Sequence, residues 1–365
     1  MKIKAAVVFE KGQPFQIKEL ELDAPKTNEV LIKVTACGVC HTDEGARQQA
    51  LPVPLPAVLG HEGCGIVEAL GPGVQGFKKG DRVGFSFGYC GTCEACRTGQ
   101  PYGCERNVEL NFSGRNFDGT TRLNYNGEDI STFFGQSAFA THAVVQVNSL
   151  IHIPDDIDLD MVGPLGCGLQ TGAGAVLNYL RPEPAASIII TGCGAVGLSA
   201  IMAAKIAGCT TIIACDIIDS RLRMARELGA THTINSKKVE SVIEAVKKIT
   251  RIGTHYAIDC TGIGACVRQS LNCTRSLGTC VIVGATAELT INVEEELMGV
   301  CKKLVGVVEG YSVPQVFIPK LLEYYKNGQF PFDKLITYYD FNDINQAFED
   351  THKGTVIKAI LKMEN

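Results

Sequence analysis

SIIITGCGAVGLSAIMAAKIAG, residues 187–208, is the stretch that decides the fold. Its first five residues are a continuous apolar run closed by a glycine turn, which predicts a strand buried on both faces of a sheet. Helical stretches are expected at 195–208, 219–229, 239–250 and 266–278. They alternate with further strand-like runs at 211–215, 256–260, 279–284 and 303–308. This alternation predicts an α/β fold with a doubly wound, six-stranded parallel sheet over residues 169–308.

Three glycines of this stretch, Gly192, Gly194 and Gly197, have the spacing G-x-G-x-x-G. Between a strand and a helix this spacing indicates a dinucleotide site, because the glycines allow a tight turn, a close approach of the pyrophosphate and close helix packing. Asp216 ends the next apolar run, nineteen residues after Gly197. A carboxylate there bonds the ribose hydroxyls and repels a 2′-phosphate, so we expect NAD rather than NADP. Arg221 either reaches the same ribose or is a solvated helix charge.

A second motif lies in residues 36–65, where Cys40 and His61 stand twenty-one residues apart. A thiolate and an imidazole can share one metal ion, and a catalytic zinc normally has three protein ligands and one open position. We expect the third ligand at Cys167, on a glycine-rich bend. Alone, Cys167 would be interpreted as a core residue. Two cysteines and one histidine together form a catalytic zinc pattern.

Four further cysteines, Cys90, Cys93, Cys96 and Cys104, have the spacing C-x2-C-x2-C-x7-C. Four thiolates within fifteen residues can enclose one tetrahedral ion and leave no open position, which predicts a structural zinc. An iron–sulfur cluster is an alternative, but its bacterial cysteine run has another spacing and a proline after the last cysteine, where this chain has Glu105. Unmetallated thiols are the other alternative. We therefore expect two zinc ions per chain, one catalytic and one structural.

The composition is that of an ordinary globular protein, with 45% apolar and 20% charged residues among 365. A net charge of −5 argues against a nucleic-acid binder. The sequence predicts no membrane-spanning segment and no secretory signal. Sixteen cysteines without such a signal favour reduced thiols that bind metal, and we expect a cytoplasmic protein.

Residues 1–168 are expected to form a β-rich domain, with residues 90–104 as its structural zinc lobe. Its strands are predicted within 5–9, 29–38, 63–70, 81–88, 137–145 and 149–154. The polar segment 105–135 is expected to be a long loop or lid. Residues 309–365, with a helix in 314–328 and a strand in 356–363, are expected to return to this first domain.

The motifs together resemble the zinc-dependent medium-chain alcohol dehydrogenases over nearly the whole chain. The resemblance rests on Gly60, His61, Glu62, Gly65, Gly71 and Val74. The cysteine cluster, Cys167 and the glycine motif then follow in the same order as in the family. PVPLPAVLGHEG, GPLGCGLQTGAGA, GVVEG and FPFDKLI look like bacterial aryl-alcohol (benzyl-alcohol) dehydrogenases. The resemblance implies a GroES-like catalytic domain built from both chain ends around a Rossmann domain, and a homodimer or homotetramer.

The resemblance also implies catalytic roles around the zinc held by Cys40, His61 and Cys167. Thr42 would pass the alcohol proton to a ribose hydroxyl, Asp43 would orient the histidine ligand, and Glu62 would be a transient or outer partner of the zinc. Many family members have a histidine three residues after the relay hydroxyl, where this chain has Gly45. The final proton exit is then either a chain of waters or His41.

Further roles concern the cofactor and the substrate. His41 and Lys358 would contact the pyrophosphate. Alternatively, His41 is only a loop residue and Lys358 only a surface charge. Val196 and Thr171 would pack behind the nicotinamide. Glu309, an acid where the family often has an apolar pocket residue, lines either the pocket or a subunit contact. Several phenylalanines either grip a flat substrate or fill the core: Phe85, Phe87, Phe112, Phe117, Phe133, Phe134 and Phe139.

The function that we predict is the NAD-dependent oxidation of aryl alcohols to aldehydes, by hydride transfer from a zinc-bound alkoxide. Three alternatives stay open. Two keep the chemistry and change the substrate, to primary aliphatic or allylic alcohols, or to S-(hydroxymethyl)glutathione. The third is a binding or structural protein on the same scaffold, which would have had no reason to keep all seven zinc ligands.

Overall fold

The computed structural model describes residues 1–363, and the chain divides into two compact units. The first comprises Met1–Cys167, Val313–Pro319 and the segment from Asp333 onward, and the second comprises Gly168–Ser312 and Lys320–Phe332. The chain therefore enters the second unit directly after Cys167. The domain boundaries predicted from the sequence lie after residues 168 and 308. The two compact units do not show which segments fold independently, so these boundaries stay a prediction.

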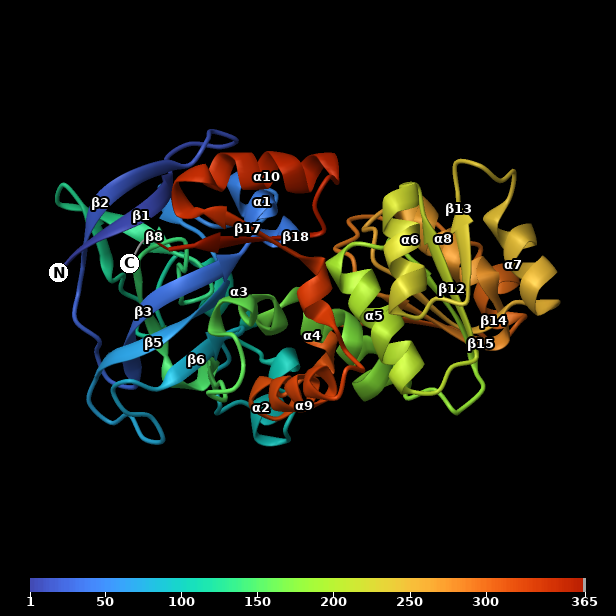
Figure 1. Cartoon of the computed structure of the whole chain (residues 1–365), viewed down its shortest axis with the longest axis horizontal. Coiled ribbons are helices and arrows are strands. Elements are labelled where there is room, and N and C mark those ends of the chain that lie inside the picture. Colours follow the sequence, from blue (N-terminus) through green and yellow to red (C-terminus); the bar gives the residue numbers. More distant parts are fainter. Residues whose placement is uncertain (364–365) are drawn as a thin grey trace. The chain divides into compact units, whose positions relative to one another are not determined.

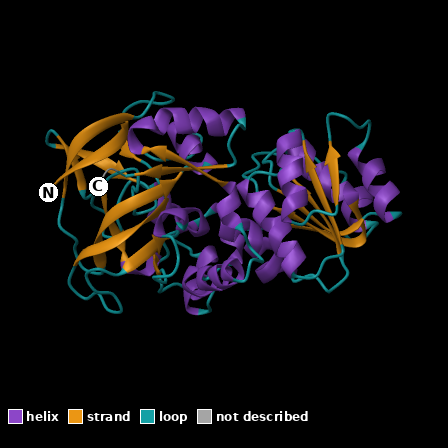
Figure 2. Ribbon diagram, viewed as in Figure 1, coloured by secondary structure: helices purple, strands orange, loops and turns teal. Residues whose placement is uncertain are grey.

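The second unit is a parallel six-stranded sheet with helices on both faces (Figures 1 and 2). The strand order is β13-β12-β11-β14-β15-β16, which confirms the doubly wound fold. The central strands are apolar because they are covered on both faces, and Ile189, Ile213 and Ala257 have no exposed surface. The bounds are α4 (Gly168–Gly174), β11 (Ser187–Thr191), α5 (Ala195–Ile206), β12 (Thr211–Asp216), α6 (Asp219–Leu228), β13 (His232–Asn235), α7 (Val242–Thr250), β14 (Thr254–Asp259), α8 (Gly264–Cys273), β15 (Thr274–Ile282) and β16 (Lys303–Gly306).

Two features of this unit differ from the sequence prediction. The edge strand β13 had no counterpart among the predicted runs, because only Ile234 among its four residues is buried. The expected helix over 266–278 was wrong at its end: α8 stops at Cys273, and the next residues already belong to β15. Leu277, with φ of 65° and 72% of its surface exposed, has a left-handed backbone that no helix accommodates.

The first unit holds a closed barrel of strands, β1-β2-β7-β8-β4, and a seven-stranded sheet. In the sheet, β18 pairs with β3 so that Ile360 lies opposite Gly38, and both ends of the chain share one structure (Figure 1). The presence of this β-rich unit and of the doubly wound unit in one chain confirms the predicted fold class. Its elements are β1 (Lys2–Val8), β2 (Gln16–Leu22), β3 (Glu29–Gly38), α1 (His41–Arg47), β4 (Ala57–Val58), β5 (Glu62–Leu70), β6 (Arg82–Phe85), α2 (Glu94–Arg97), α3 (Asn107–Phe112), β7 (Leu123–Tyr125), β8 (Glu128–Thr132), β9 (His142–Gln146), β10 (Leu150–His152), β17 (Ile336–Asp340), α10 (Ile344–Lys353) and β18 (Lys358–Lys362), with α9 (Pro314–Lys326) divided between the units.

The segment 105–135 is not the long loop that its composition predicted. It forms α3 and the hairpin of β7 and β8. A buried ion pair fastens it: Nε and Nη2 of Arg122 donate to the Glu29 carboxylate at 2.8 and 2.7 Å, and both side chains are almost fully buried. The composition of 105–135 does not reveal this regular structure, because polar residues that suggest a loop take part in a buried hydrogen-bond network.

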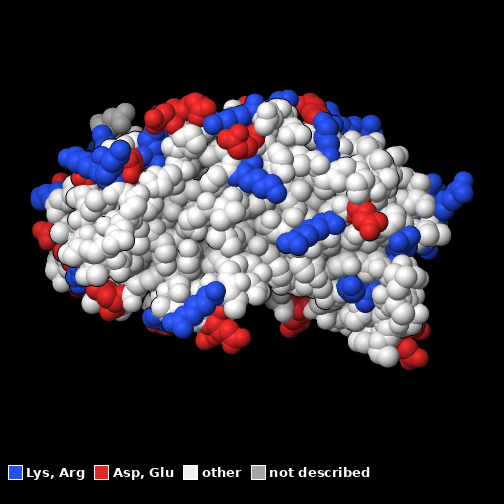
Figure 3. Space-filling model, turned by 90° about the horizontal axis from the view of Figure 1, so that it is seen from below, with Lys and Arg blue, Asp and Glu red and all other residues white. Residues whose placement is uncertain are grey.

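The distribution of charged side chains on the surface agrees with the small net charge of the sequence. On the face drawn in Figure 3, basic and acidic side chains are interspersed and form no continuous basic patch. Within residues 1–363, no helix is long and apolar enough to cross a membrane.

Replacing Arg122 with alanine should lower the free energy of unfolding by about 3–5 kcal/mol, because Glu29 would keep a buried charge without its partner. Arg115 is a matched control, since it pairs with Asp129 in the same segment but at the surface, with 44% and 60% of the two side chains exposed. Its alanine variant should cost about 0–1 kcal/mol. Urea unfolding followed by circular dichroism compares the two, and equal losses would contradict the importance of the buried pair.

Candidate metal and cofactor sites

Four potential ligands meet in the first unit, although they come from distant parts of the chain. Ligand atoms of Cys40, His61, Glu62 and Cys167 all lie within 4.8 Å of one another. Cys40 precedes α1, His61 directly precedes β5, Glu62 is the first residue of β5, and Cys167 follows a 3₁₀ turn, Gly163–Gly166. The structure thus brings the three predicted zinc ligands together, with a carboxylate beside them.

Two glycines bring Cys167 to this position. An ideal Cβ on Gly163 would lie 2.1 Å from a carbonyl oxygen of β5, and one on Gly166 would lie 1.8 Å from a carbonyl oxygen of β6. Both distances exclude a side chain at Gly163 and Gly166, so the backbone of the bend packs directly against β5 and β6. The Ser86 hydroxyl donates to the Gly166 carbonyl at 2.7 Å and holds the bend in place.

Asp43 is fully buried and connects three parts of the site. One carboxylate oxygen accepts from the backbone N–H of Gly60 at 3.0 Å and lies 3.0 Å from His61 Nδ1, and the other accepts from the backbone N–H of Cys40 at 3.0 Å. Burial opposes a charge on the imidazole, but Asp43 outweighs it and raises the pKa of His61. The hydrogen bond to Asp43 assigns the ring proton to Nδ1, which leaves Nε2 for a metal.

The remaining nitrogen of His61 fits a metal ligand, because Nε2 is buried and has no hydrogen-bond partner. A buried polar atom without a partner is costly, and a metal ion would remove that cost. The adjacent Cys167 thiol, together with His61, holds the pKa of Cys40 well below its ordinary value. This favours the thiolate, the form that binds metal. Two sulfurs and one imidazole nitrogen are the ligand set expected for zinc.

Glu62 is paired with a lysine from the other end of the chain. Lys358 Nζ donates to both carboxylate oxygens at 3.0 and 2.9 Å and to the Val39 carbonyl at 3.0 Å. Lys358 is only 4% exposed, so it is not a surface charge. Since three acceptors already use its three N–H groups, a pyrophosphate contact would have to break this pair. In the structure Lys358 is the counter-charge of Glu62, and the pyrophosphate role that the resemblance implies stays a prediction.

The residues that follow Cys40 lie on α1. The Thr42 hydroxyl is 3.6 Å from the Cys40 sulfur, and the side chain is half-buried. His41, the first residue of the helix, is exposed. An ideal Cβ on Gly45 would meet only Leu51, at an ordinary contact distance of 3.5 Å. Packing therefore does not require a glycine where many family members have histidine.

Aromatic rings cover the imidazole of His61. The ring of Phe134 stacks on it with centroids 4.6 Å apart, and the ring of Phe133 meets it edge to face at 5.4 Å. Phe134 has a left-handed φ of 54°, a conformation that a bulky residue seldom adopts. Phe133 and Phe134 belong, with Phe85, Phe87 and Phe139, to the buried hydrophobic core of the first unit.

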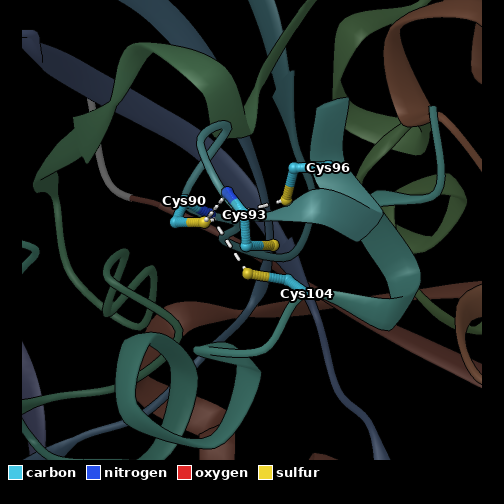
Figure 4. Close-up of side chains that lie close together, drawn as sticks. All are labelled: Cys90, Cys93, Cys96 and Cys104. Carbon is cyan, nitrogen blue, oxygen red and sulfur yellow. Dashed lines mark hydrogen bonds between the residues drawn. The ribbon is translucent and has the colours of Figure 1, made fainter. Parts of the chain in front are cut away.

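The four-cysteine cluster forms a second site. The sulfurs of Cys90, Cys93, Cys96 and Cys104 point toward one another and lie within 4.8 Å (Figure 4). The Cys90 sulfur accepts backbone N–H groups from Thr92 and Cys93 at 3.4 and 3.3 Å. Burial raises the pKa of Cys90, but these donors outweigh it and lower the pKa to about 6. Four thiols of this arrangement fit a closed structural zinc site.

The glycine turn of the second unit has the shape of a dinucleotide site. Gly192 has a φ of 88°, and an ideal Cβ on Gly197 would lie 1.8 Å from the Gly192 carbonyl oxygen, so both positions require glycine. Above Gly194 no atom lies within 4 Å of the ideal Cβ position. This leaves the space that a pyrophosphate needs at the start of α5.

Asp216 connects the end of β12 to this turn. One oxygen accepts from the Cys193 N–H at 2.7 Å and the other from the Ile218 N–H at 2.8 Å. A carboxylate has about four acceptor positions, so both oxygens can still accept from ribose hydroxyls. Arg221 has a buried Nε without a hydrogen-bond partner, which supports the ribose role over that of a solvated charge.

The remaining cofactor candidates lie on two touching helices. An ideal Cβ on Gly172 of α4 would lie 1.9 Å from the Val196 carbonyl oxygen in α5. Thr171 is therefore next to the turn that contains Val196. Its hydroxyl donates to Glu309 at 3.4 Å, a contact that no sequence pattern indicates.

A donor set suited to catalytic zinc, a four-thiol site and a dinucleotide turn define a zinc-containing dehydrogenase. Comparison with family models agrees: residues 26–155 match the alcohol dehydrogenase GroES-like domain, and residues 195–323 match the zinc-binding dehydrogenase domain. The chain belongs to the zinc-dependent medium-chain alcohol dehydrogenase family. The prediction of an alcohol dehydrogenase is thereby confirmed.

Individual relatives are similar over the full length. The geraniol dehydrogenase of Castellaniella defragrans is 41% identical, with 98% of this chain and 97% of the relative covered. The crystal structure of benzyl alcohol dehydrogenase from Acinetobacter calcoaceticus is 44% identical with a TM-score of 0.96, and both chains are fully covered. That of an alcohol dehydrogenase zinc-binding domain protein from Burkholderia ambifaria is 46% identical with a TM-score of 0.97, again over both full chains.

Replacing Asp43 with alanine should weaken zinc binding at the Cys40 site by about 10- to 100-fold, because the His61 ring and the Cys40 backbone both lose their anchor. Glu44→Ala is the matched control, since this neighbour on the same helix pairs with Arg47 at 2.7 Å. Competition with a chromophoric chelator measures both affinities. Unchanged zinc affinity in D43A would show that Asp43 does not position the ligands.

Proposed function

We propose that this alcohol dehydrogenase is a cytoplasmic, NAD-dependent enzyme that oxidises aryl alcohols of the benzyl alcohol type to aldehydes. The observation that carries the substrate class is the pair of rings, Phe133 and Phe134, packed on the candidate zinc ligand His61. Both rings are buried, so they make the surroundings of this ligand apolar and aromatic, which favours an aryl substrate over a polar one. The similarity to benzyl alcohol dehydrogenase supports the same class.

In the proposed reaction, RCH₂OH and NAD⁺ become RCHO, NADH and H⁺. Bound zinc would supply Lewis acidity that lowers the pKa of the substrate hydroxyl, and the nicotinamide would accept the hydride. Thr42 accepts the hydroxyl proton in a hydrogen bond and passes it to a ribose hydroxyl. Asp43 keeps the His61 ring in place, while Lys358 balances the charge of Glu62. With Gly45 in the outer position, the proton leaves through water or His41.

The cofactor and the assembly are parts of the same proposal. The Asp216 carboxylate at the end of β12 supports NAD over NADP. The strand β16 lies at an edge of the parallel sheet, near the exposed apolar residues Met298 and Val308 in the sequence. We propose this edge as the contact of a homodimer or homotetramer, which sedimentation would show as a species of at least twice the chain mass.

Allylic alcohols are a second candidate class. The relative that is named geraniol dehydrogenase is 41% identical over nearly the whole chain. Geraniol is apolar and has a planar double bond next to its hydroxyl carbon, so the same aromatic surroundings of His61 suit it too. The alternative of a non-enzymatic protein is not favoured by the family assignment.

Replacing Thr42 with alanine should reduce kcat by roughly 10²- to 10⁴-fold, because the substrate hydroxyl would lose its proton acceptor. Thr42→Ser is the matched control, since it keeps the hydroxyl and should retain most of the turnover. Steady-state kinetics with benzyl alcohol measure both variants, with zinc content checked to be equal. Full activity in T42A would exclude Thr42 from the proton path.

A substrate and cofactor panel should give a kcat/KM for benzyl alcohol with NAD at least about tenfold above that for hexanol, since hexanol has no flat face to stack. Cinnamyl alcohol, geraniol and S-(hydroxymethyl)glutathione complete the panel, and each is measured with NAD and NADP. Equal efficiency on hexanol would contradict the aryl class, and a preference for geraniol would move the enzyme to the allylic class. Efficient use of NADP would contradict the role of Asp216.

A further inference from the structure

Glu309 has no role in the proposed chemistry, yet its carboxylate is anchored inside the second unit. Its Oε2 atom accepts from Gln170 Nε2 at 3.2 Å and from the Thr171 hydroxyl at 3.4 Å. Gln170 has no exposed surface, and Glu309 is half-buried. Both donors lie on α4, the helix that contains the candidate nicotinamide contact.

The backbone around Glu309 keeps the carboxylate there. Glu309, Gly310 and Tyr311 have successive left-handed φ angles of 48°, 61° and 48°. An ideal Cβ on Gly310 would lie 2.3 Å from the Gln170 carbonyl oxygen, and Asn178 Nδ2 donates to the Gly310 carbonyl at 3.0 Å. Residues with side chains seldom adopt this conformation, and such strain concentrates at ligand sites, where the surroundings maintain it.

The position of α4 indicates what this carboxylate faces. Gly172 touches the first turn of α5, at the glycine motif, and α4 itself begins one residue after the candidate zinc ligand Cys167. A dinucleotide with its pyrophosphate at Gly194 has its nicotinamide only one ribose away from that pyrophosphate, and Thr171 lies on the helix that packs against the same turn. Glu309 is bonded to Thr171. This step rests on the proposed function.

We propose that the Glu309 carboxylate lies beside the nicotinamide and makes the enzyme bind NAD⁺ more tightly than a neutral residue would, with little effect on NADH. The nicotinamide ring has a positive charge only in its oxidised form, so a neighbouring carboxylate attracts NAD⁺ and not NADH. At a separation of about 7 Å in a partly exposed site, the preference is on the order of 3- to 50-fold. Glu309 thereby raises the fraction of enzyme that carries NAD⁺ rather than NADH, and, because it stabilises the oxidised ring, it also makes hydride transfer to the bound cofactor less favourable.

The test measures the dissociation constants of NAD⁺, NADH and ADP-ribose for the full-length holoenzyme by isothermal titration calorimetry. In E309Q, which keeps the shape and removes the charge, NAD⁺ binding should weaken by about 3- to 50-fold, whereas NADH and ADP-ribose should change by less than about twofold. ADP-ribose lacks the nicotinamide and reports on the rest of the site. Glu244→Gln is the matched control, because it removes one charge from a surface pair on α7 of the same unit.

E309D keeps the charge and should keep most of the preference for NAD⁺. Equal weakening of NAD⁺ and NADH in E309Q would overturn the proposal, as would unchanged binding of all three ligands, or a loss in E309D as large as in E309Q. If the unmodified enzyme binds neither the dinucleotides nor ADP-ribose, the proposed function fails, and this inference fails with it. A general folding defect would weaken ADP-ribose as well and would also count against the proposal.

Discussion

The hydrogen bonds of one buried carboxylate, Asp43, are the constraint on which the candidate metal site depends. They join the start of α1, the turn before β5 and the imidazole of His61. A charge without exposed surface is tolerated only when its acceptor positions are used, and here each contact also positions a ligand or its backbone. The same interaction therefore stabilises the fold locally and orients His61 Nε2.

The second constraint is backbone contact that only glycine allows. Gly163 and Gly166 let the bend before Cys167 lie on β5 and β6, and Gly197 lets α5 touch the dinucleotide turn. These contacts connect the sites to the sheets rather than to mobile loops. The candidate metal ligands and the candidate cofactor turn thus take their geometry from regular structure, which suits groups that must be held to within fractions of an ångström.

Much of this could be predicted from the sequence, since chemistry of this kind needs particular residues at particular spacings. The glycine motif, the four-cysteine run and the pair Cys40 and His61 are local patterns, and the apolar strands of the second unit are long and uniform. The sequence did not reveal the polar strand β13 or the hairpin within 105–135. A buried Arg122 looks the same in a sequence as a solvated one, because its partner Glu29 is 93 residues away.

Long-range pairing also explains which contacts at the sites the sequence could not indicate. β18 returns beside β3 and brings Lys358 to Glu62, a pair of residues 296 positions apart, while its predicted role at the pyrophosphate stays a prediction. The contact between Glu309 and Thr171 joins residues 138 positions apart, so no sequence spacing indicates it. The stacking of Phe134 on His61 depends on a left-handed backbone at a phenylalanine, which propensity argues against.

The central claim is that Cys40, His61 and Cys167 hold one zinc ion, separate from the ion of the four-cysteine cluster. Zinc per chain, measured by inductively coupled plasma mass spectrometry on the dialysed protein and on Cys167→Ser, tests it most directly. The account predicts two zinc ions in the unmodified chain and one in C167S, with two retained when the buried core residue Cys215 is replaced by serine. Two zinc ions in C167S, or one in the unmodified chain, would contradict it.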